Sequence, residues 1–181
     1  HTITNSVIDQ DAYYTILSST QVDGDSFPGS PSPATTTLPA LDLAAWEAQA
    51  AAGGVISGNY SPADNSSLGP KKILGNLTLG NGVDLTVTGA IWVVGDITTS
   101  PNSKFLLDSA FGANGTWIIA DDPANPGTKG KITVENGTEI SGSGHEQSHI
   151  WFISTNTSLT DSSPAISVDN TAQGAIFSAH D

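Results

Sequence analysis

The chain has no cysteine, and all five of its cationic side chains are lysine, so arginine is absent as well. Without cysteine there is no disulfide, no thiolate ligand for a metal and no thiol nucleophile. This argues against a small, disulfide-stapled secreted domain of the vertebrate type and leaves a bacterial surface protein open.

Positive charge is scarce: eighteen acidic residues against five lysines give a formal net charge of −13. Nucleic acids and anionic membranes bind proteins through a cationic surface, so we expect neither as a partner. Long apolar runs are also missing, since none approaches the roughly 18 residues of a membrane span. The chain begins at His1 without a signal peptide, and we expect a processed product or a piece of a longer protein.

Short strands dominate what is present. A dense β-branched and aromatic run occurs four times, every 25 to 34 residues, and this recurrence predicts the coils of a solenoid. Aligned by their aromatic residues, the four runs predict an aromatic column of Trp92, Trp117, Trp151 and Phe177. The polar Thr116 in the alternate slot favours tryptophans inside; if they face out, residues 1–60 are the available cover.

A second recurring strand precedes a turn that contains asparagine. These strands begin at Leu77, Ile97, Ile132 and Ile166, whose side chains we expect to point inward. The next residues would form an outward column of Thr78, Thr98, Thr133 and Ser167. The turns predict an asparagine ladder of Asn81, Asn102, Asn136 and Asn170, because asparagine tolerates the left-handed conformation and can bond to a stacked copy of itself.

These patterns predict an all-β fold, a right-handed parallel β-helix (β-solenoid) of about four coils, with one short α-helix packed as a cap or side brace. The coils would run over 75–94, 95–120, 130–153 and 164–179, with insertions at 121–129 and 154–163. Residues 42–52 form the helix, with Asp42 as N-cap and Gly53-Gly54 as stop. We place residues 1–70 (a strand segment, an irregular proline-rich stretch over 23–40 and the helix) on the solenoid formed by 71–181.

Several motifs resemble one bacterial family, the repeat-rich β-helical surface proteins associated with type IV pilus-like genes. They are Trp46-Glu47-Ala48-Gln49-Ala50, Gly53-Gly54, Leu68-Gly69-Pro70-Lys71-Lys72-Ile73, Gly75-Asn76-Leu77-Thr78, Asp11-Ala12-Tyr13-Tyr14 and Phe27-Pro28-Gly29-Ser30. The resemblance implies an extracellular module at the cell surface, part of a longer chain with further coils. It implies no catalytic residue.

Two motifs could carry catalytic chemistry. His145-Glu146-Gln147-Ser148-His149 fits H-E-x-x-H, in which two histidines one helical turn apart bind zinc. Glycines precede it and a strand follows it, so His145 and His149 would lie about 13 Å apart, too far for one metal. Asp121 and Asp122, with His145, could instead supply acid and base for glycoside hydrolysis, although β-helix glycosidases also use cationic substrate contacts.

Two further functions remain open from the sequence. A flat threonine array would suit ice binding, but charged residues such as Asp96, Lys131 and Glu135 interrupt it. Acidic turns such as Asp23-Gly24-Asp25 could bind Ca²⁺ as the one candidate cofactor. We therefore predict a non-enzymatic structural or adhesive module of a bacterial, pilus-associated extracellular protein, with glycans or surface and pilus proteins as partners. The alternatives are a carbohydrate-active β-helix enzyme and an ice-binding solenoid.

Overall fold

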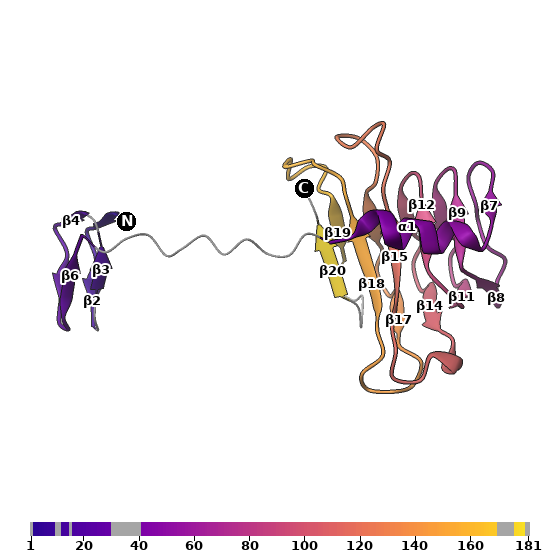
Figure 1. Ribbon diagram of the computed structural model, residues 1–181, viewed down its shortest axis with the longest axis horizontal. Helices are drawn as coiled ribbons and strands as arrows, with labels where there is room; N and C mark the ends of the chain where they lie inside the picture. The colour runs from indigo at the N-terminus through magenta and orange to yellow at the C-terminus, as the bar shows by residue number, and fades with distance from the viewer. Residues whose placement is uncertain (1, 10–11, 15, 30–40, 170–175, 180–181) are drawn as a thin grey trace. The chain divides into compact units, whose positions relative to one another are not determined.

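The computed structural model describes residues 2–9, 12–14, 16–29, 41–169 and 176–179, and it divides the chain into two compact units, His1–Leu41 and Asp42–Asp181 (Figure 1). The described part is mostly β-structure in parallel sheets, with one α-helix. The division falls after Leu41, not after residue 70 where we expected it. The helix therefore belongs to the same unit as the large sheets.

The first unit is built from parallel strand pairs. Its strands are β1 (Thr2–Thr4), β2 (Val7–Ile8), β3 (Ala12–Tyr14), β4 (Ile16–Ser18), β5 (Gln21–Val22) and β6 (Ser26–Pro28). Strand β1 pairs with β4, β2 with β5 and β3 with β6. The paired residues are fourteen positions apart in the sequence, as Val7 and Gln21 are. Strand β6 enters the stretch that we expected to be irregular. Pro28 is tolerated because a two-stranded pair leaves one side of each strand without a ladder. Residues 30–40 of that stretch lie outside the described part.

The second unit contains three parallel sheets. The six-stranded sheet has the order β20 (Ile176–Ala179), β18 (Ile150–Ser154), β15 (Thr116–Ala120), β12 (Ile91–Val93), β9 (Lys71–Ile73) and β7 (Val55–Ile56). The β10 sheet has the order β10 (Leu77–Leu79), β13 (Ile97–Thr99), β16 (Ile132–Val134) and β19 (Ile166–Val168). The β11 sheet has the order β17 (Glu139–Ser141), β14 (Lys104–Leu107), β11 (Asp84–Val87) and β8 (Ser66–Leu68). A short 3₁₀ turn, Ser109–Phe111, follows β14.

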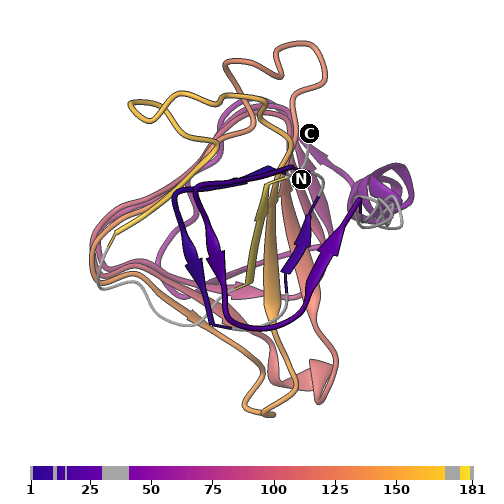
Figure 2. The same ribbon diagram turned by 90° about the vertical axis from the view of Figure 1, so that its left-hand side faces the viewer.

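The chain visits these sheets in a repeating order, and successive circuits of the second unit superimpose in Figure 2. The strands predicted at Leu77, Ile97, Ile132 and Ile166 are β10, β13, β16 and β19, paired in that register. Thr78, Thr98, Thr133 and Ser167 therefore do form one row. A further circuit that we did not predict begins at β7 and continues through Tyr60, which bridges to Leu77 of β10. Its strands carry polar and lysine residues, which hide the alternation that marks the later ones.

The apolar interior follows from alternation along each short strand. Leu77, Ile97 and Ile132 are fully buried, whereas the threonines that follow them are only half-buried. In the interior Phe152 meets Phe105 edge to face, with 5.1 Å between ring centroids, and the partly buried Phe177 at 5.5 Å. Alternation with period two thus puts one hydrophobic residue of every pair into a common core.

Helix α1 (Leu43–Ala52) lies against β9 and β12 of the six-stranded sheet (Figure 1). It begins as predicted, because the Asp42 side chain accepts a hydrogen bond from the backbone N–H of Ala45 at 3.1 Å. It ends at Gly53 and buries Ala50 completely, so it is a side brace and not a cap. Within the described residues, no helix has the length and apolarity needed to cross a membrane.

Candidate functional site: a tryptophan pocket on the six-stranded sheet

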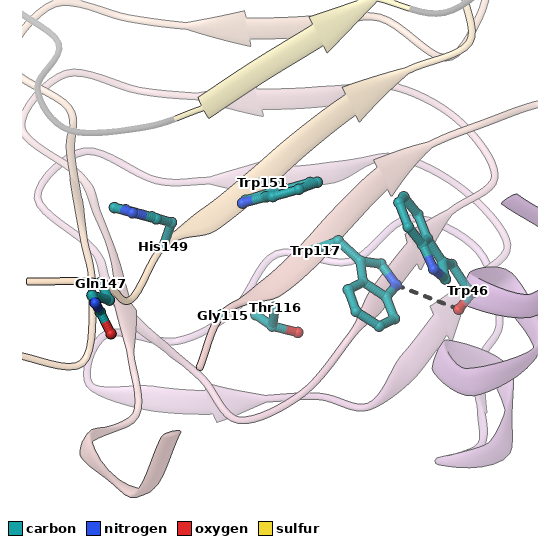
Figure 3. Close-up of a pocket in the computed structure, with 7 residues that line it drawn as sticks. All are labelled: Trp46, Gly115, Thr116, Trp117, Gln147, His149 and Trp151. Atoms are coloured by element: carbon teal, nitrogen blue, oxygen red, sulfur yellow. Dashed lines mark hydrogen bonds between the residues drawn. The ribbon is translucent and has the colours of Figure 1, made fainter. Parts of the chain in front are cut away.

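A pocket of about 270 Å³ opens between helix α1 and the outer face of the six-stranded sheet. We call it the tryptophan pocket; it is lined by Trp46, Gly115, Thr116, Trp117, Gln147, His149 and Trp151 (Figure 3). The lining comes from the helix, from β15 and β18, and from the loop that precedes β18. None of the lining residues is acidic or a lysine. The tryptophans make one side of the pocket aromatic, and Gln147 and His149 make the other side polar.

The aromatic side is built around Trp46. Its indole stacks on that of Trp117, with 5.1 Å between centroids and 27° between planes, and it meets Trp151 edge to face at 6.5 Å and 79°. The Trp117 Nε1 donates to the Trp46 carbonyl at 3.5 Å. Trp151 remains 43% exposed, and its Nε1 donates to no acceptor in the described chain. One indole is therefore available to a ligand while two brace each other.

The polar side is the loop before β18. Gln147 and His149 lie across the pocket from Trp46 and Trp117 (Figure 3). The buried Ser148 between them holds the loop, because its hydroxyl donates to the His145 carbonyl at 2.7 Å and accepts from the Ser143 N–H at 2.8 Å. Gly115 forms the floor, where an added Cβ would stand 2.5 Å from the His149 carbonyl oxygen. Only glycine lets strand and loop approach so closely.

The predicted aromatic column is wrong as a set. Trp117 does pair with Trp151, but Trp92 pairs with Ile119, and Phe177 pairs with Phe152 instead of Trp151. The register is set by inward residues, so that Ile91 lies beside Ile118. For Trp92 the offset is two residues, which keeps every side chain on its face, so an alignment by tryptophan identity could not detect it. Phe177 is offset by one residue, which turns it inward beside Phe152.

The tryptophans also face outward, against the hint from Thr116. Thr116 is buried, whereas Trp92 and Trp117 are half-buried and Trp151 is exposed. The cover that we named for this case lies within residues 1–60, and α1 provides it through Trp46. The helix face of Leu43, Trp46 and Ala50 was a usable signal for this docking, whereas nothing in the sequence marked Gln147.

Asp121 lies beside Glu47 of α1. The pKa of Glu47 is raised to about 8, first by burial, then by a hydrogen bond with Asp121 and by that residue's negative charge, while Lys72 opposes the shift. One carboxyl oxygen of Glu47 is buried without a hydrogen-bond partner in the described chain. Nearby, Lys72 Nζ lies 3.4 Å from the centroid of the Trp92 ring, and Trp92 Nε1 donates to the Asp121 carbonyl at 3.2 Å.

The three candidate residues for glycoside hydrolysis are not brought together. Asp121 follows β15, whereas His145 precedes β18, and these parallel strands pair from Thr116–Ile150 to Ala120–Ser154. They therefore stand at opposite ends of the strands, about 16 Å apart along them. Asp122 is used locally, since its carboxylate accepts from the Ala124 N–H at 3.1 Å and from the Asn125 side chain at 3.0 Å.

The H-E-x-x-H segment is a turn, as its glycines indicated, with the Ser148 N–H bonded to the His145 carbonyl at 3.0 Å. His145 and His149 are both exposed. In the first unit, the Asp23 carboxylate accepts from Gln21 Nε2 at 2.8 Å. Across the described ranges, three or more histidine, aspartate or glutamate side chains nowhere gather as a metal site would require.

The predicted asparagine ladder is displaced. Asn81 and Asn136 occupy the second position of their turns, but Pro101 holds that position between them. Asn102 stands one residue later, at a φ of 59°, in the left-handed position that Gly82 and Gly137 occupy in the other circuits. Asn170 lies outside the described residues. The shared feature is a turn whose third residue needs positive φ, which asparagine and glycine both supply.

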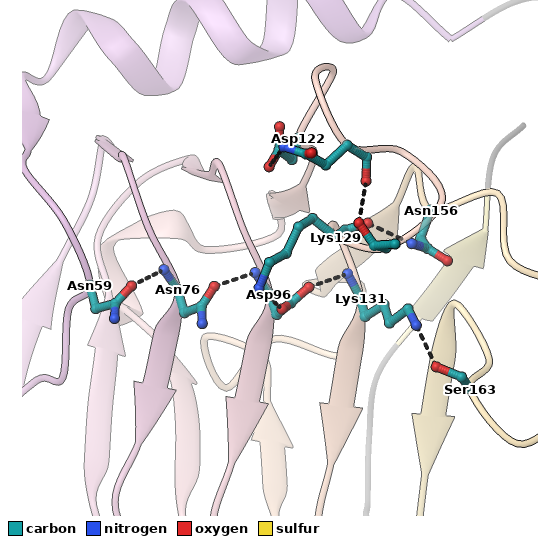
Figure 4. Close-up of polar contacts among 10 residues, drawn as sticks. Asn59, Asn76, Asp96, Asp122, Lys129, Lys131, Asn156 and Ser163 are labelled. Atoms are coloured by element: carbon teal, nitrogen blue, oxygen red, sulfur yellow. Dashed lines mark hydrogen bonds and ion pairs between the residues drawn. The ribbon is translucent and has the colours of Figure 1, made fainter.

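A ladder exists at a different corner, directly before the β10 sheet (Figure 4). In each rung a side-chain oxygen accepts a hydrogen bond from the backbone N–H of the next circuit. Asn59 accepts from the Asn76 N–H at 2.9 Å, Asn76 from the Asp96 N–H at 3.0 Å, and Asp96 from the Lys131 N–H at 3.1 Å. Gly95 precedes Asp96 because a Cβ there would lie 2.6 Å from the Asn76 oxygen. The signal was a glycine followed by asparagine or aspartate before a strand.

Asp96→Ala is expected to lower the free energy of unfolding by about 2 kcal/mol, because it leaves the Lys131 N–H without its acceptor. It also removes the ion pair of Asp96 with Lys129 at 2.9 Å. Asp96→Asn is the matched control: it keeps an acceptor like that of Asn76 and loses only the partly exposed ion pair, worth about 1 kcal/mol or less. Urea unfolding measures both. Equal losses in the two variants would contradict the ladder's role.

Comparison of the chain with protein-family models, with curated proteins and with solved structures found no match.

Proposed function

We propose that residues 42–181 form a right-handed parallel β-helix and that the chain is a non-enzymatic structural or adhesive module of a bacterial, pilus-associated surface protein, located outside the cell. The observation that carries this proposal is the repeated visit to three parallel sheets in matching register. Right-handedness is the choice of nearly all parallel crossovers. A stack of such circuits is a rigid rod whose outer faces can present binding residues.

One feature supports adhesion over a purely mechanical role. The tryptophan pocket leaves Trp151 exposed on a rigid sheet, and exposed aromatic residues flanked by polar groups mark binding sites. The surface setting rests on the resemblance of residues 46–54 and 68–78 to pilus-associated proteins. The partners we propose are glycans or other surface and pilus proteins, with no role for nucleic acid or for a membrane in contact with this segment.

The alternative is a carbohydrate-active enzyme, and one observation favours it. Glu47 stays protonated at neutral pH beside Asp121, and a carboxyl pair of this kind is what acid–base hydrolysis requires. Against this, Asp121 lies close enough to Glu47 to raise its pKa, so the two carboxyl groups are not held apart as a glycosidic bond would need, and neither lines the tryptophan pocket. For ice binding, the threonine row is in register, but Asp96 and Lys131 flank it.

Beads coated with the protein test the proposal. We expect them to be retained under flow on films of at least one neutral polysaccharide, such as mannan, galactan, dextran or chitin, and to release no reducing ends from it. Beads carrying heat-unfolded protein are the control. Retention on none of the films would contradict adhesion to these glycans, and release of reducing ends that Asp121→Asn abolishes would establish the enzyme instead.

A further inference from the structure

The tryptophan pocket has the size of a site for one small ring. Its volume of about 270 Å³ falls just below the range of about 300–1,000 Å³ typical of pockets for drug-sized ligands. It also lies on rigid elements, since β15 and β18 pair over their whole length and the Ser148 hydroxyl braces the loop. A ligand would thus enter a site that is already formed, with little cost in ordering the protein.

The polar groups of the pocket restrict the chemistry of its ligand. The side chains of Gln147 and His149 make no hydrogen bond within the described chain, and together they offer donors and acceptors on one side. An apolar ligand or a quaternary ammonium ion would leave these groups unpaired when it displaced their water. An anionic ligand would meet a chain of net charge −13 with no cationic side chain in the lining.

The aromatic groups select the shape of the ligand. Trp46 and Trp117 use a face against each other, whereas Trp151 meets Trp46 through a single edge-to-face contact and is 43% exposed, so at least one face of its indole is open. The face of an indole is electron-rich and attracts weakly positive C–H groups. The matching molecule has one flat face of C–H groups and a rim of hydroxyls, which describes a pyranose.

We propose that the tryptophan pocket binds one neutral pyranose residue, stacked on Trp151 and hydrogen-bonded through its hydroxyls to Gln147 and His149. The proposal rests on the adhesive function proposed above and names its ligand class. A single ring of this size is expected to bind with about millimolar affinity, because it has few atoms with which to offset the cost of association. Adhesion would then come from many such weak contacts along a surface polysaccharide.

The test is a titration of the whole chain with methyl glycosides of glucose, galactose and mannose and with N-acetylglucosamine, followed by indole N–H resonances and tryptophan fluorescence. We expect at least one sugar to shift the Trp151 signal with saturation. Trp151→Ala should weaken binding at least tenfold, and Gln147→Ala should do so without changing the indoles. Trp92→Phe, on the same sheet but outside the pocket, is the matched control and should bind as wild type.

Three results would overturn the proposal: saturation by none of the sugars, saturation by choline at lower concentration than by any sugar, or an equal loss in Trp92→Phe. Thermal unfolding of each variant confirms that it is folded, which is expected because Trp151 is exposed. Sugar binding without bead retention would leave the pocket established and remove the adhesive role. Bead retention that Trp151→Ala does not weaken would support the adhesive role and show that the tryptophan pocket is not its site.

Discussion

Phe152→Ala is expected to lower the free energy of unfolding by about 4 kcal/mol, twice the loss expected for Asp96→Ala. Phe152 is fully buried in β18, and its ring contacts Phe105 edge to face at 5.1 Å and Phe177 at 5.5 Å. The Phe152 ring is the central one of three that join the two sheets, so its removal breaks both ring contacts. It also leaves a cavity that the short paired strands cannot close. Urea unfolding at neutral pH measures the loss.

The control is the preceding residue of the same strand. Trp151→Phe changes a larger, exposed side chain on the outer face and is expected to cost about 1 kcal/mol or less. Hydrogen exchange adds a spatial test, because each circuit contacts chiefly its neighbours. Protection should fall most in β15, β18 and β20. A uniform loss that reaches β9 as strongly, or equal costs for the two variants, would contradict this account of the core.

Glu47→Gln is expected to remove a loss of stability that wild type suffers as the pH rises. In the unfolded chain this carboxyl ionises near its ordinary pKa of 4.5, whereas in the folded protein its pKa is about 8. Between these values the folded state holds the additional proton, so the contribution of Glu47 to the free energy of unfolding falls with rising pH. The neutral amide imitates the protonated acid. The variant should match wild type near pH 5 and exceed it near pH 9.

Denaturant unfolding at several pH values measures this difference, with Glu146→Gln as a control that removes one acidic side chain from an exposed loop. Asp121→Asn gives a second test. It removes the negative charge of Asp121 and leaves Glu47 buried, so the pKa of Glu47 should fall part of the way toward 4.5. The pH range over which Glu47 lowers the stability should then become narrower. A difference between Glu47→Gln and wild type that is the same at every pH would show that Glu47 does not titrate as described.

Much of the fold was predictable because it depends on local alternation. The four strands of the β10 sheet were placed to the residue, and α1 was placed from Asp42 and the paired glycines. Both depend on side chains close together in the sequence, where inward and outward positions or caps can be read directly. The circuit that begins at β7 was missed because lysine and serine stand where the alternation should be apolar.

The site was harder to predict because it depends on register and docking. The offset between Trp92 and Trp117 is invisible to alternation, since both alignments keep the same residues outward. The asparagine ladder was sought by residue identity, whereas the real one requires only a side-chain oxygen, which Asn76 and Asp96 both have. The pocket joins Trp46 to residues about seventy to a hundred positions away. The apolar face of the helix indicated that it docks, but no local pattern specifies which residues it meets.

The ladder before the β10 sheet has a consequence for how this protein can change in length. Each rung joins a side-chain oxygen to a backbone N–H of the next circuit, and every residue except proline carries that N–H. A rung can therefore form with any circuit that follows it, whatever the sequence of that circuit, provided that the donor residue is not proline. If the segment from Asp96 to Gly130 were excised, Asn76 would meet Lys131, whose N–H already serves as a donor in the same corner. At this corner the circuits are therefore interchangeable, and a whole circuit could be removed or added while the ladder keeps its bonds from side-chain oxygen to backbone N–H.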